Sequence, residues 1–435
     1  MAIQDIPTQT GVFPYLHLAL VFIVAEYALE HYISILQLNR KVKNTTLPSV
    51  LKPLEIQDEE YQKSRSYTIA KLRFGLAVET IETIIKCVLL YFYYGPWVWN
   101  LSAEILSQMG RDPSSEFMRA LVVLGIEYVR EKITGIPISL IHSFVLEARY
   151  GFNKMTIGTF IKDEIKKLLL SVVLTPPILY VLLWVIEAGG QYFYIYVEVV
   201  VFVIIIIMMF LYPNFIAPLF NKFEDLKEGS LRDKIYALAS KLDYPLKKIF
   251  VCDGSKRSSH SNAYLFGFWK NKRIVLFDTI LEHLDEDEIE AVLGHELGHW
   301  KKGHTWKLMI MSLVQIFVTF YVYGFFMYNK GIFQSFGYKD QSIFIGLLLF
   351  SSMYAPISYI LGILSLRITR TFEYQADEFS VQHGYGNKLS SGLIKMFKKN
   401  AGDMDPHPMY AAFKYSHPAL IERLNHITAV QKKQQ

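Results

Sequence analysis

Cysteine and charge are both scarce in this 435-residue chain, and each scarcity narrows what the protein can be. With only two cysteines, Cys87 and Cys252, the chain has no disulfide framework beyond one bridge and no cysteine-based zinc ribbon. Charged residues make up 20% of the sequence, whereas a typical soluble domain has about 25%. The net charge of +5 is small for this length, so nucleic acid is not an expected partner.

Apolar residues are abundant instead, and they gather in long runs. They form 52% of the chain, and its mean hydropathy is +0.23. A membrane-spanning helix needs about 20 largely apolar residues. We therefore predict a multi-pass membrane protein with seven spans, at residues 11–36, 74–99, 118–143, 165–187, 192–212, 306–328 and 342–366.

The basic residues of the connecting loops predict the orientation, because cytosolic loops are enriched in lysine and arginine. The loops after the first and third predicted spans are basic, and those after the second and fourth are poor in basic residues. Segments 213–305 and 367–435 are rich in lysine. We therefore expect the N-terminus to be lumenal and these two segments to be cytosolic.

Charged side chains interrupt two predicted spans. They are Glu79, Glu82 and Lys86 in the second, and Glu127, Arg130, Glu131 and Lys132 in the third. A charge that faces lipid costs roughly 2.5–3.5 kcal/mol, so these residues should face other helices or water. Two explanations stay open: structural ion pairs, such as Glu82 with Lys86 one helical turn away, or helices that enclose a polar chamber.

The chemistry is carried by residues 295–299, which read His-Glu-Leu-Gly-His. Helical spacing places His295 and His299 on one face, one turn apart, where both can bind one zinc ion. Glu296 can then reach the open position of the metal and take a proton from water there. This pattern is typical of zinc proteases. His304 is interpreted as structural or peripheral.

A catalytic zinc ion needs a third protein ligand, and the best candidate is Glu373. It lies in residues 371–378, Thr-Phe-Glu-Tyr-Gln-Ala-Asp-Glu. Asp377 follows four residues later on the same helical face, from where it can orient a histidine ligand. A predicted membrane hairpin separates Glu373 from His295, but the predicted topology returns both residues to the cytosolic side.

Four parts of the chain are predicted: residues 1–212 with five membrane helices, 213–305 as a cytosolic metalloprotease domain, 306–366 with two more membrane helices, and 367–435 as a cytosolic part with the third ligand. In the protease domain, residues 230–242 and 285–299 predict helices, and 248–252, 263–269 and 273–278 predict strands, with a turn at 270–272. The expected fold class is mainly α: about seven membrane helices that enclose a chamber, and a cytosolic domain with a small β-sheet.

Seven stretches together resemble the eukaryotic type-1 CAAX prenyl protease family: residues 150–154, 217–223, 256–264, 272–279, 295–300, 372–377 and 415–418. The resemblance spans essentially the whole chain. It implies one zinc ion bound by His295, His299 and Glu373, with Glu296 as general base and acid. It further implies that Asn262 and His417 stabilise the oxyanion, and that substrate adds as a strand beside Asn262, Ala263 and Tyr264. Arg423 matches a family position near the substrate path.

The family's reaction implies the expected function. Such enzymes remove the last three residues from prenylated proteins that end in Cys-aliphatic-aliphatic-X (CAAX), and some make a second, upstream cut. The expected partners are therefore farnesylated CAAX proteins and membrane lipid. The expected location is the endoplasmic reticulum membrane, and the inner nuclear membrane as a second site, with the active site facing the cytosol. The dilysine Lys432-Lys433 is similar to an endoplasmic-reticulum retrieval address.

Two other functions stay open. A membrane quality-control protease would use the same zinc site on misfolded or stalled substrates, and activity on unprenylated peptides would favour it. A non-enzymatic scaffold or transporter would account for the charged spans. An intact Glu296 beside three ligands argues against this last interpretation, since a protein without catalysis has no need of the base.

Overall fold

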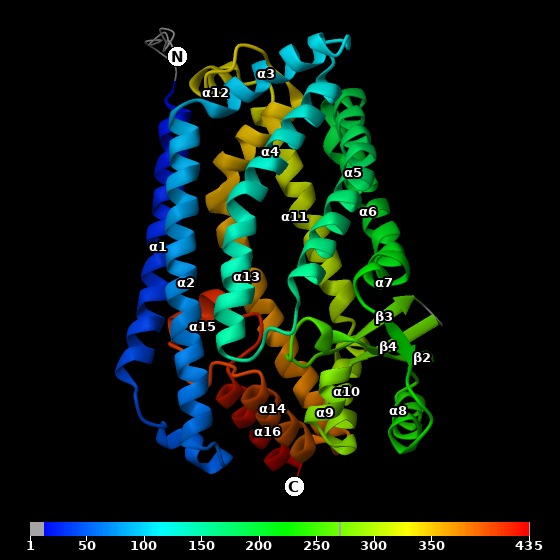
Figure 1. Cartoon of the computed structure of the whole chain (residues 1–435). Helices are drawn as coiled ribbons and strands as arrows, with labels where there is room; N and C mark the ends of the chain where they lie inside the picture. Colours follow the sequence, from blue (N-terminus) through cyan, green and yellow to red (C-terminus); the bar gives the residue numbers. More distant parts are fainter. Residues whose placement is uncertain (1–12, 269–270, 435) are drawn as a thin grey trace.

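The structure, a computed structural model, describes residues 13–268 and 271–434. Long helices run through most of the molecule, and a compact unit with a small sheet lies at one end, beside the C-terminus (Figure 1). The long helices are α1 Tyr15–Lys43, α2 Asp58–Tyr91, α4 Glu116–Leu140, α5 Ile157–Ala188, α6 Phe193–Leu211, α11 His304–Phe326 and α13 Ile343–Gln382.

The membrane helices follow the predicted spans. Within the described residues, five segments are long and apolar enough to cross a membrane: Tyr15–Lys43, Ile157–Ala188, Gly190–Phe220, His304–Phe326 and Ile343–Gln382. The chain is thus a multi-pass membrane protein. Helices α2 and α4 are also long, with 34 and 25 residues, but they carry the charged side chains named above. The count of seven spans stays a prediction, and residues 11 and 12 of the first lie outside the described residues.

The charges of α4 form ion pairs. Arg130 Nη2 lies 2.6 Å from Glu127 Oε2 one turn before it, and Lys132 Nζ lies 2.6 Å from Glu164 Oε2 on α5. Each pair neutralises a charge that would otherwise be expensive to hold away from bulk water. Structural ion pairs thus account for part of the charge on α4.

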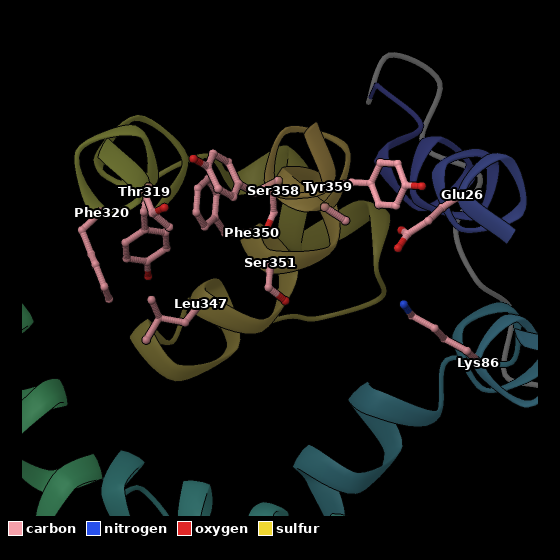
Figure 2. Close-up of a pocket in the computed structure, with 12 residues that line it drawn as sticks. Glu26, Lys86, Thr319, Phe320, Leu347, Phe350, Ser351, Ser358 and Tyr359 are labelled. Atoms are coloured by element: carbon pink, nitrogen blue, oxygen red, sulfur yellow. The ribbon is translucent and has the colours of Figure 1, made fainter. Parts of the chain in front are cut away.

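Two charges of α2, Glu82 and Lys86, border cavities, one of which Arg130 and Glu131 of α4 also line. In the described part of the chain Glu82 and Lys86 form no ion pair with each other, and both line a cavity of about 600 Å³. Lys86 also lines a second cavity, of about 460 Å³, between α1, α2, α11 and α13. There Glu26 and Lys86 point toward one another, and the Tyr359 hydroxyl is directed toward Glu26 (Figure 2). A polar interior between the helices accounts for these residues.

Shorter helices close both ends of the bundle. Helices α3 Tyr94–Gln108 and α12 Lys330–Ser335 lie at the end opposite the sheet (Figure 1). Toward the sheet, π-helical turns at Ile141–Glu147 and Tyr212–Ile216 extend α4 and α6, and α7 Ala217–Phe220 follows. The remaining helices are α8 Ser230–Lys241, α9 Asp278–His283, α10 Glu286–Lys301, α14 Gly386–Lys399, α15 Pro408–Lys414 and α16 Leu420–Gln434.

The sheet has four strands in the order β1-β2-β4-β3: β1 Phe223–Asp225, β2 Leu246–Cys252, β3 Ala263–Phe268 and β4 Asn271–Phe277. Strands β2 and β4 are parallel, and the other two pairs are antiparallel. The three predicted strands are confirmed, except that residues 269 and 270 lie outside the described residues and Asp278 begins α9. The predicted turn at 270–272 is wrong at residues 271 and 272, which belong to β4, and β1 was not predicted. Strand β3 is at the edge, so within the described chain its outer side is free of strand partners.

Helix α10 is positioned by its own first turn and by its buried face. Asp285 accepts a hydrogen bond from Glu288 N at 2.9 Å, and Glu288 accepts one from Asp285 N at 2.9 Å. Leu293 and Leu297 are fully buried in the core that α10 shares with the sheet, α8, α14 and α16. The predicted helices 230–242 and 285–299 are thus confirmed as α8 and α10.

Helix α13 joins the membrane part to this unit. It is a single helix of 40 residues that continues well beyond the predicted end of the last span at residue 366. Its C-terminal quarter packs against α10. The predicted division of the chain at residue 366 falls inside this helix, and the four-part division stays a prediction.

Substitution of Gly298 by alanine should destabilise the protein, because α10 and α13 meet there. An added Cβ would lie 3.1 Å from Phe379 Cβ and 3.2 Å from Ala376 Cα, an overpacked contact that costs about 1–3 kcal/mol. Gly362→Ala is the matched control, since its Cβ would meet nothing within 4 Å and alanine favours a helix by about 1 kcal/mol. Thermal unfolding in detergent should show a lower Tm for Gly298→Ala alone. Equal shifts for both variants would contradict the close crossing.

Candidate metal centre

The first two candidate ligands lie on the buried face of α10. His295 and His299 are one turn apart, and their Nε2 atoms lie 3.2 Å from each other. His295 is 6% exposed, and His299 is half-buried. When neither nitrogen carries a hydrogen, both are acceptors and cannot form a hydrogen bond with each other. A cation between them is then the natural partner of both.

The third candidate ligand arrives on α13. Glu373 Oε1 lies 3.3 Å from His299 Nε2, and Glu373 Oε2 lies 3.5 Å from His295 Nε2. Glu373 is 4% exposed, and its Oε2 is buried without a hydrogen-bond partner. A buried, unpartnered carboxylate oxygen is costly, which indicates that another group satisfies it.

These three residues fit one metal ion. Their ligand atoms all lie within 4.8 Å of one another, and no other such group of three occurs among the described residues. A tetrahedral zinc ion with ligand distances of about 2.0–2.1 Å separates its ligand atoms by roughly 3.3 Å. The observed separations of 3.2, 3.3 and 3.5 Å match that edge length. The donor set of two imidazoles and one carboxylate is also one that catalytic zinc uses.

Asp377 holds His295 from behind. Its Oδ1 lies 2.8 Å from His295 Nδ1, which leaves His295 Nε2 directed at the candidate metal position. Burial alone would lower the pKa of His295, but the hydrogen bond to Asp377 and the nearby carboxylate of Glu373 raise it to about 9. Without a metal, the site therefore holds a proton that a metal must displace.

Arg423 clamps Asp377 in place. Its Nε and Nη2 donate hydrogen bonds to the two Asp377 oxygens at 2.9 and 2.6 Å. Arg423 is 6% exposed and Asp377 is fully buried, so the pair is a buried, bidentate ion pair. Arg423 is thus not a solvated surface arginine. Its role in the substrate path stays a prediction, whereas its contact with Asp377 supports the ligand His295.

Glu296 lies beside the cluster and is half-buried. Burial raises the pKa of its carboxyl, and the positive charges of His295 and His299 oppose that rise. A carboxylate whose pKa lies above its ordinary value is a better proton acceptor, as a general base requires.

His304, predicted to be structural or peripheral, is a buried structural residue, and its contact with the site was not predicted. It is 2% exposed, and its Nδ1 lies 2.9 Å from His299 Nδ1. Its Nε2 lies 2.9 Å from Gln375 Oε1, and its ring stacks on Phe372 at 4.3 Å. His304 is the third histidine of the segment 295–304, but it begins α11 and does not belong to α10, so helical spacing does not predict its contact with His299.

Of the other predicted site residues, His417 lies against the cluster, and Asn262, Ala263 and Tyr264 lie in or next to the edge strand β3. His417 Nε2 lies 3.4 Å from Glu373 Oε1, and the His417 side chain is 62% exposed. Asn262 immediately precedes the edge strand β3, and its side chain is exposed apart from a 2.9 Å bond from Ala263 N to Asn262 Oδ1. Ala263 is buried, and Tyr264 is half-buried against Phe277. Strand β3 packs beside α10, the helix that carries the histidines.

Comparison with known proteins decides the family. Residues 38–222 match the family model described as CAAX prenyl protease N-terminal, five membrane helices, and residues 225–431 match peptidase family M48. A CAAX prenyl protease 1 homolog of Arabidopsis thaliana is 42% identical over 97% of this chain and 99% of its own length. The chain belongs to the CAAX prenyl protease 1 family. It is therefore a membrane metalloendopeptidase.

Other family members support the same assignment over the whole chain. A CAAX prenyl protease 1 homolog of Oryza sativa subsp. japonica is 41% identical over 97% of this chain and 99% of its own length. The crystal structure of S. mikatae Ste24p, 35% identical, superimposes with a TM-score of 0.91 and covers 96% of this chain and 100% of its own. The predicted fold class and family are thus confirmed.

Metal binding by this protein should depend on pH, because the metal displaces a proton from His295. Since the metal displaces one proton from a group with a pKa of about 9, its apparent affinity should rise about tenfold per pH unit between pH 7 and 8. Competition with a chelating dye at the two pH values measures this apparent affinity.

Asp377→Asn should weaken metal affinity by roughly 10–100-fold and flatten its pH dependence, because the raised pKa of His295 depends on the Asp377 carboxylate. Glu378→Gln, at the next position on α13, is the control. A pH dependence that is the same in wild type and Asp377→Asn would contradict this account.

Proposed function

We propose that this chain is a zinc endopeptidase that removes the C-terminal three residues from prenylated CAAX proteins. The observation that carries the proposal is the ligand triangle of His295, His299 and Glu373, with tetrahedral edge lengths, on a helix packed beside the free edge strand β3. The relatives that match the whole chain bear the name of CAAX prenyl proteases, which supports this substrate class. A second, upstream cut belongs to the same proposal.

Zinc and Glu296 would divide the chemistry between them. Zinc in this centre supplies Lewis-acid chemistry: it makes a water more acidic and polarises a carbonyl. Glu296 accepts the proton of the attacking water on its carboxylate and delivers it to the amide nitrogen that leaves. The raised pKa of Glu296 suits both halves of that transfer.

Strand β3 would bind the substrate peptide. An extended peptide can pair with an exposed strand edge through main-chain hydrogen bonds, and β3 offers such an edge beside α10. Asn262, Ala263 and Tyr264 would line the position next to the scissile bond. His417 and Asn262 would donate hydrogen bonds to the oxyanion, for which the exposed imidazole of His417 near Glu373 is well situated.

We infer the location from the same substrate class. A prenylated protein is anchored by its lipid, so an enzyme embedded in the bilayer meets both the tail and the surrounding membrane lipid. The lysine-rich segments 213–305 and 367–435 favour a cytosolic active site. We therefore propose the endoplasmic reticulum membrane, with the inner nuclear membrane as a second location.

The decisive assay compares a farnesylated CAAX peptide with its unprenylated twin on protein purified in detergent. Wild type should cut only the farnesylated peptide. Glu296→Gln should lower kcat by about 10²–10⁴-fold, because the general base is lost, while zinc content stays at one ion per chain. Glu286→Gln, in the first turn of the same helix, should retain activity. Equal cleavage of both peptides would contradict the prenylated substrate class and favour a quality-control protease. A wild type that cuts neither peptide and binds no zinc would contradict an enzymatic function.

His417→Ala should lower kcat while it leaves zinc content and KM nearly unchanged. The reason is that a donor to the oxyanion acts in the transition state, where one such bond is worth about 10²–10³ in kcat. Steady-state kinetics on the farnesylated peptide measures kcat and KM separately. A change in KM alone would show that His417 serves substrate binding instead.

A further inference from the structure

The two histidine ligands differ in what stands behind them. His295 donates its Nδ1 proton to the carboxylate of Asp377 at 2.8 Å. His299 faces a neutral ring instead, because its Nδ1 lies 2.9 Å from Nδ1 of His304. Of two facing imidazole nitrogens only one can carry the hydrogen, so the contact between His299 and His304 must have a direction.

Gln375 sets that direction. Its Oε1 lies 2.9 Å from His304 Nε2, and an amide oxygen only accepts hydrogen bonds. His304 Nε2 therefore carries the single hydrogen of the neutral ring, and His304 Nδ1 is left as an acceptor. His299 Nδ1 must then be the donor, which leaves His299 Nε2 with a free lone pair. That nitrogen is the atom 3.3 Å from Glu373 Oε1, in the ligand triangle.

The reverse order would disable the ligand. If the amide nitrogen of Gln375 faced His304, it would donate to His304 Nε2, and His304 Nδ1 would carry the hydrogen toward His299. His299 would then keep its own hydrogen on Nε2, where a metal needs the lone pair. Only the arrangement with the Gln375 oxygen toward His304 is compatible with a metal ion held by His299.

Packing fixes both members of this arrangement. The His304 ring lies parallel to Phe372, with 5° between the planes, and is almost fully buried at the start of α11. Gln375 lies on α13 between Glu373 and Asp377. The same helix therefore supplies the ligand Glu373, the partner of His295 and the partner of His304.

We propose that Gln375 and His304 are positioning residues that fix the His299 tautomer with hydrogen on Nδ1, and so keep His299 Nε2 available as a metal ligand. The proposal rests on the proposed zinc site. Gln375 and His304 would thus orient His299 in the way that Asp377 orients His295. Partners of this kind typically contribute a factor of about 10–100 to metal affinity.

The test is zinc affinity, measured by competition with a chelating dye on the purified full-length protein. His304→Phe keeps the stack on Phe372 but removes the acceptor, and Gln375→Met keeps the length of the side chain but removes the oxygen. Each should weaken zinc binding by about 10–100-fold. His304→Asn and Gln375→Glu each retain an acceptor at the required place and should retain most of the affinity. Gln382→Met, an exposed glutamine on the same helix, is the matched control.

The double variant gives the sharpest outcome. Since Gln375 acts through His304 alone, Gln375→Met should cause no further loss in the His304→Phe background. Cleavage of the farnesylated peptide by the weakened variants should recover when zinc is added in excess. Equal affinities for Gln375→Met and Gln375→Glu, or additive losses in the double variant, would overturn the proposal. A wild type that binds no zinc would instead overturn the proposed function, so the two failures are distinguishable.

Discussion

Where α10 crosses α13, glycines at positions 294 and 298 allow the two backbones to come close enough for side chains of both helices to reach one metal position. A Cβ on Gly294 would lie 3.2 Å from Ser380 Oγ, the group that donates a hydrogen bond to Ala291 O across the crossing. His295 and His299 project from one helix, and Glu373 and Asp377 from the other. The ligand triangle, the Asp377 clamp and the Gln375–His304 contact all require this one separation between helices.

The crossing also concentrates charge in a place with little water. Glu373, Asp377 and Arg423 are each less than 7% exposed. Burial of such groups is expensive, and loss of one partner from a buried ion pair typically costs about 3–5 kcal/mol. A divalent cation in the triangle would satisfy the unpartnered Glu373 oxygen and offset the negative charge. Metal binding and stability are therefore expected to be coupled in this part of the protein.

Much of this arrangement could be predicted from local pattern and topology. Periodicity located α8 and α10, and the return of Glu373 to the same side as His295 followed from counting spans. Strand β1 was missed because three residues carry no readable alternation. The contact of His304 with His299 was not predicted, because it depends on the turn at Gly303, which has a positive φ of 68°, and helical spacing says nothing about that turn. Ion pairs and cavity-lining charges on α2 and α4 looked alike in sequence, since only packing shows which charges pair and which border a cavity.

The length of α13 ties the metal centre to the bilayer. Glu373 is about 30 residues from the start of this helix, a distance of about 45 Å along its axis. Rotation of such a rod by one degree about its far end would move the carboxylate by about 0.8 Å, whereas metal ligands tolerate about 0.2 Å. Pro356 interrupts the backbone hydrogen bonds between the two ends and is the natural place for the helix to bend. A tilt of α13 imposed by a change in bilayer thickness would therefore reach the candidate metal centre unless the α10–α13 contact resists it.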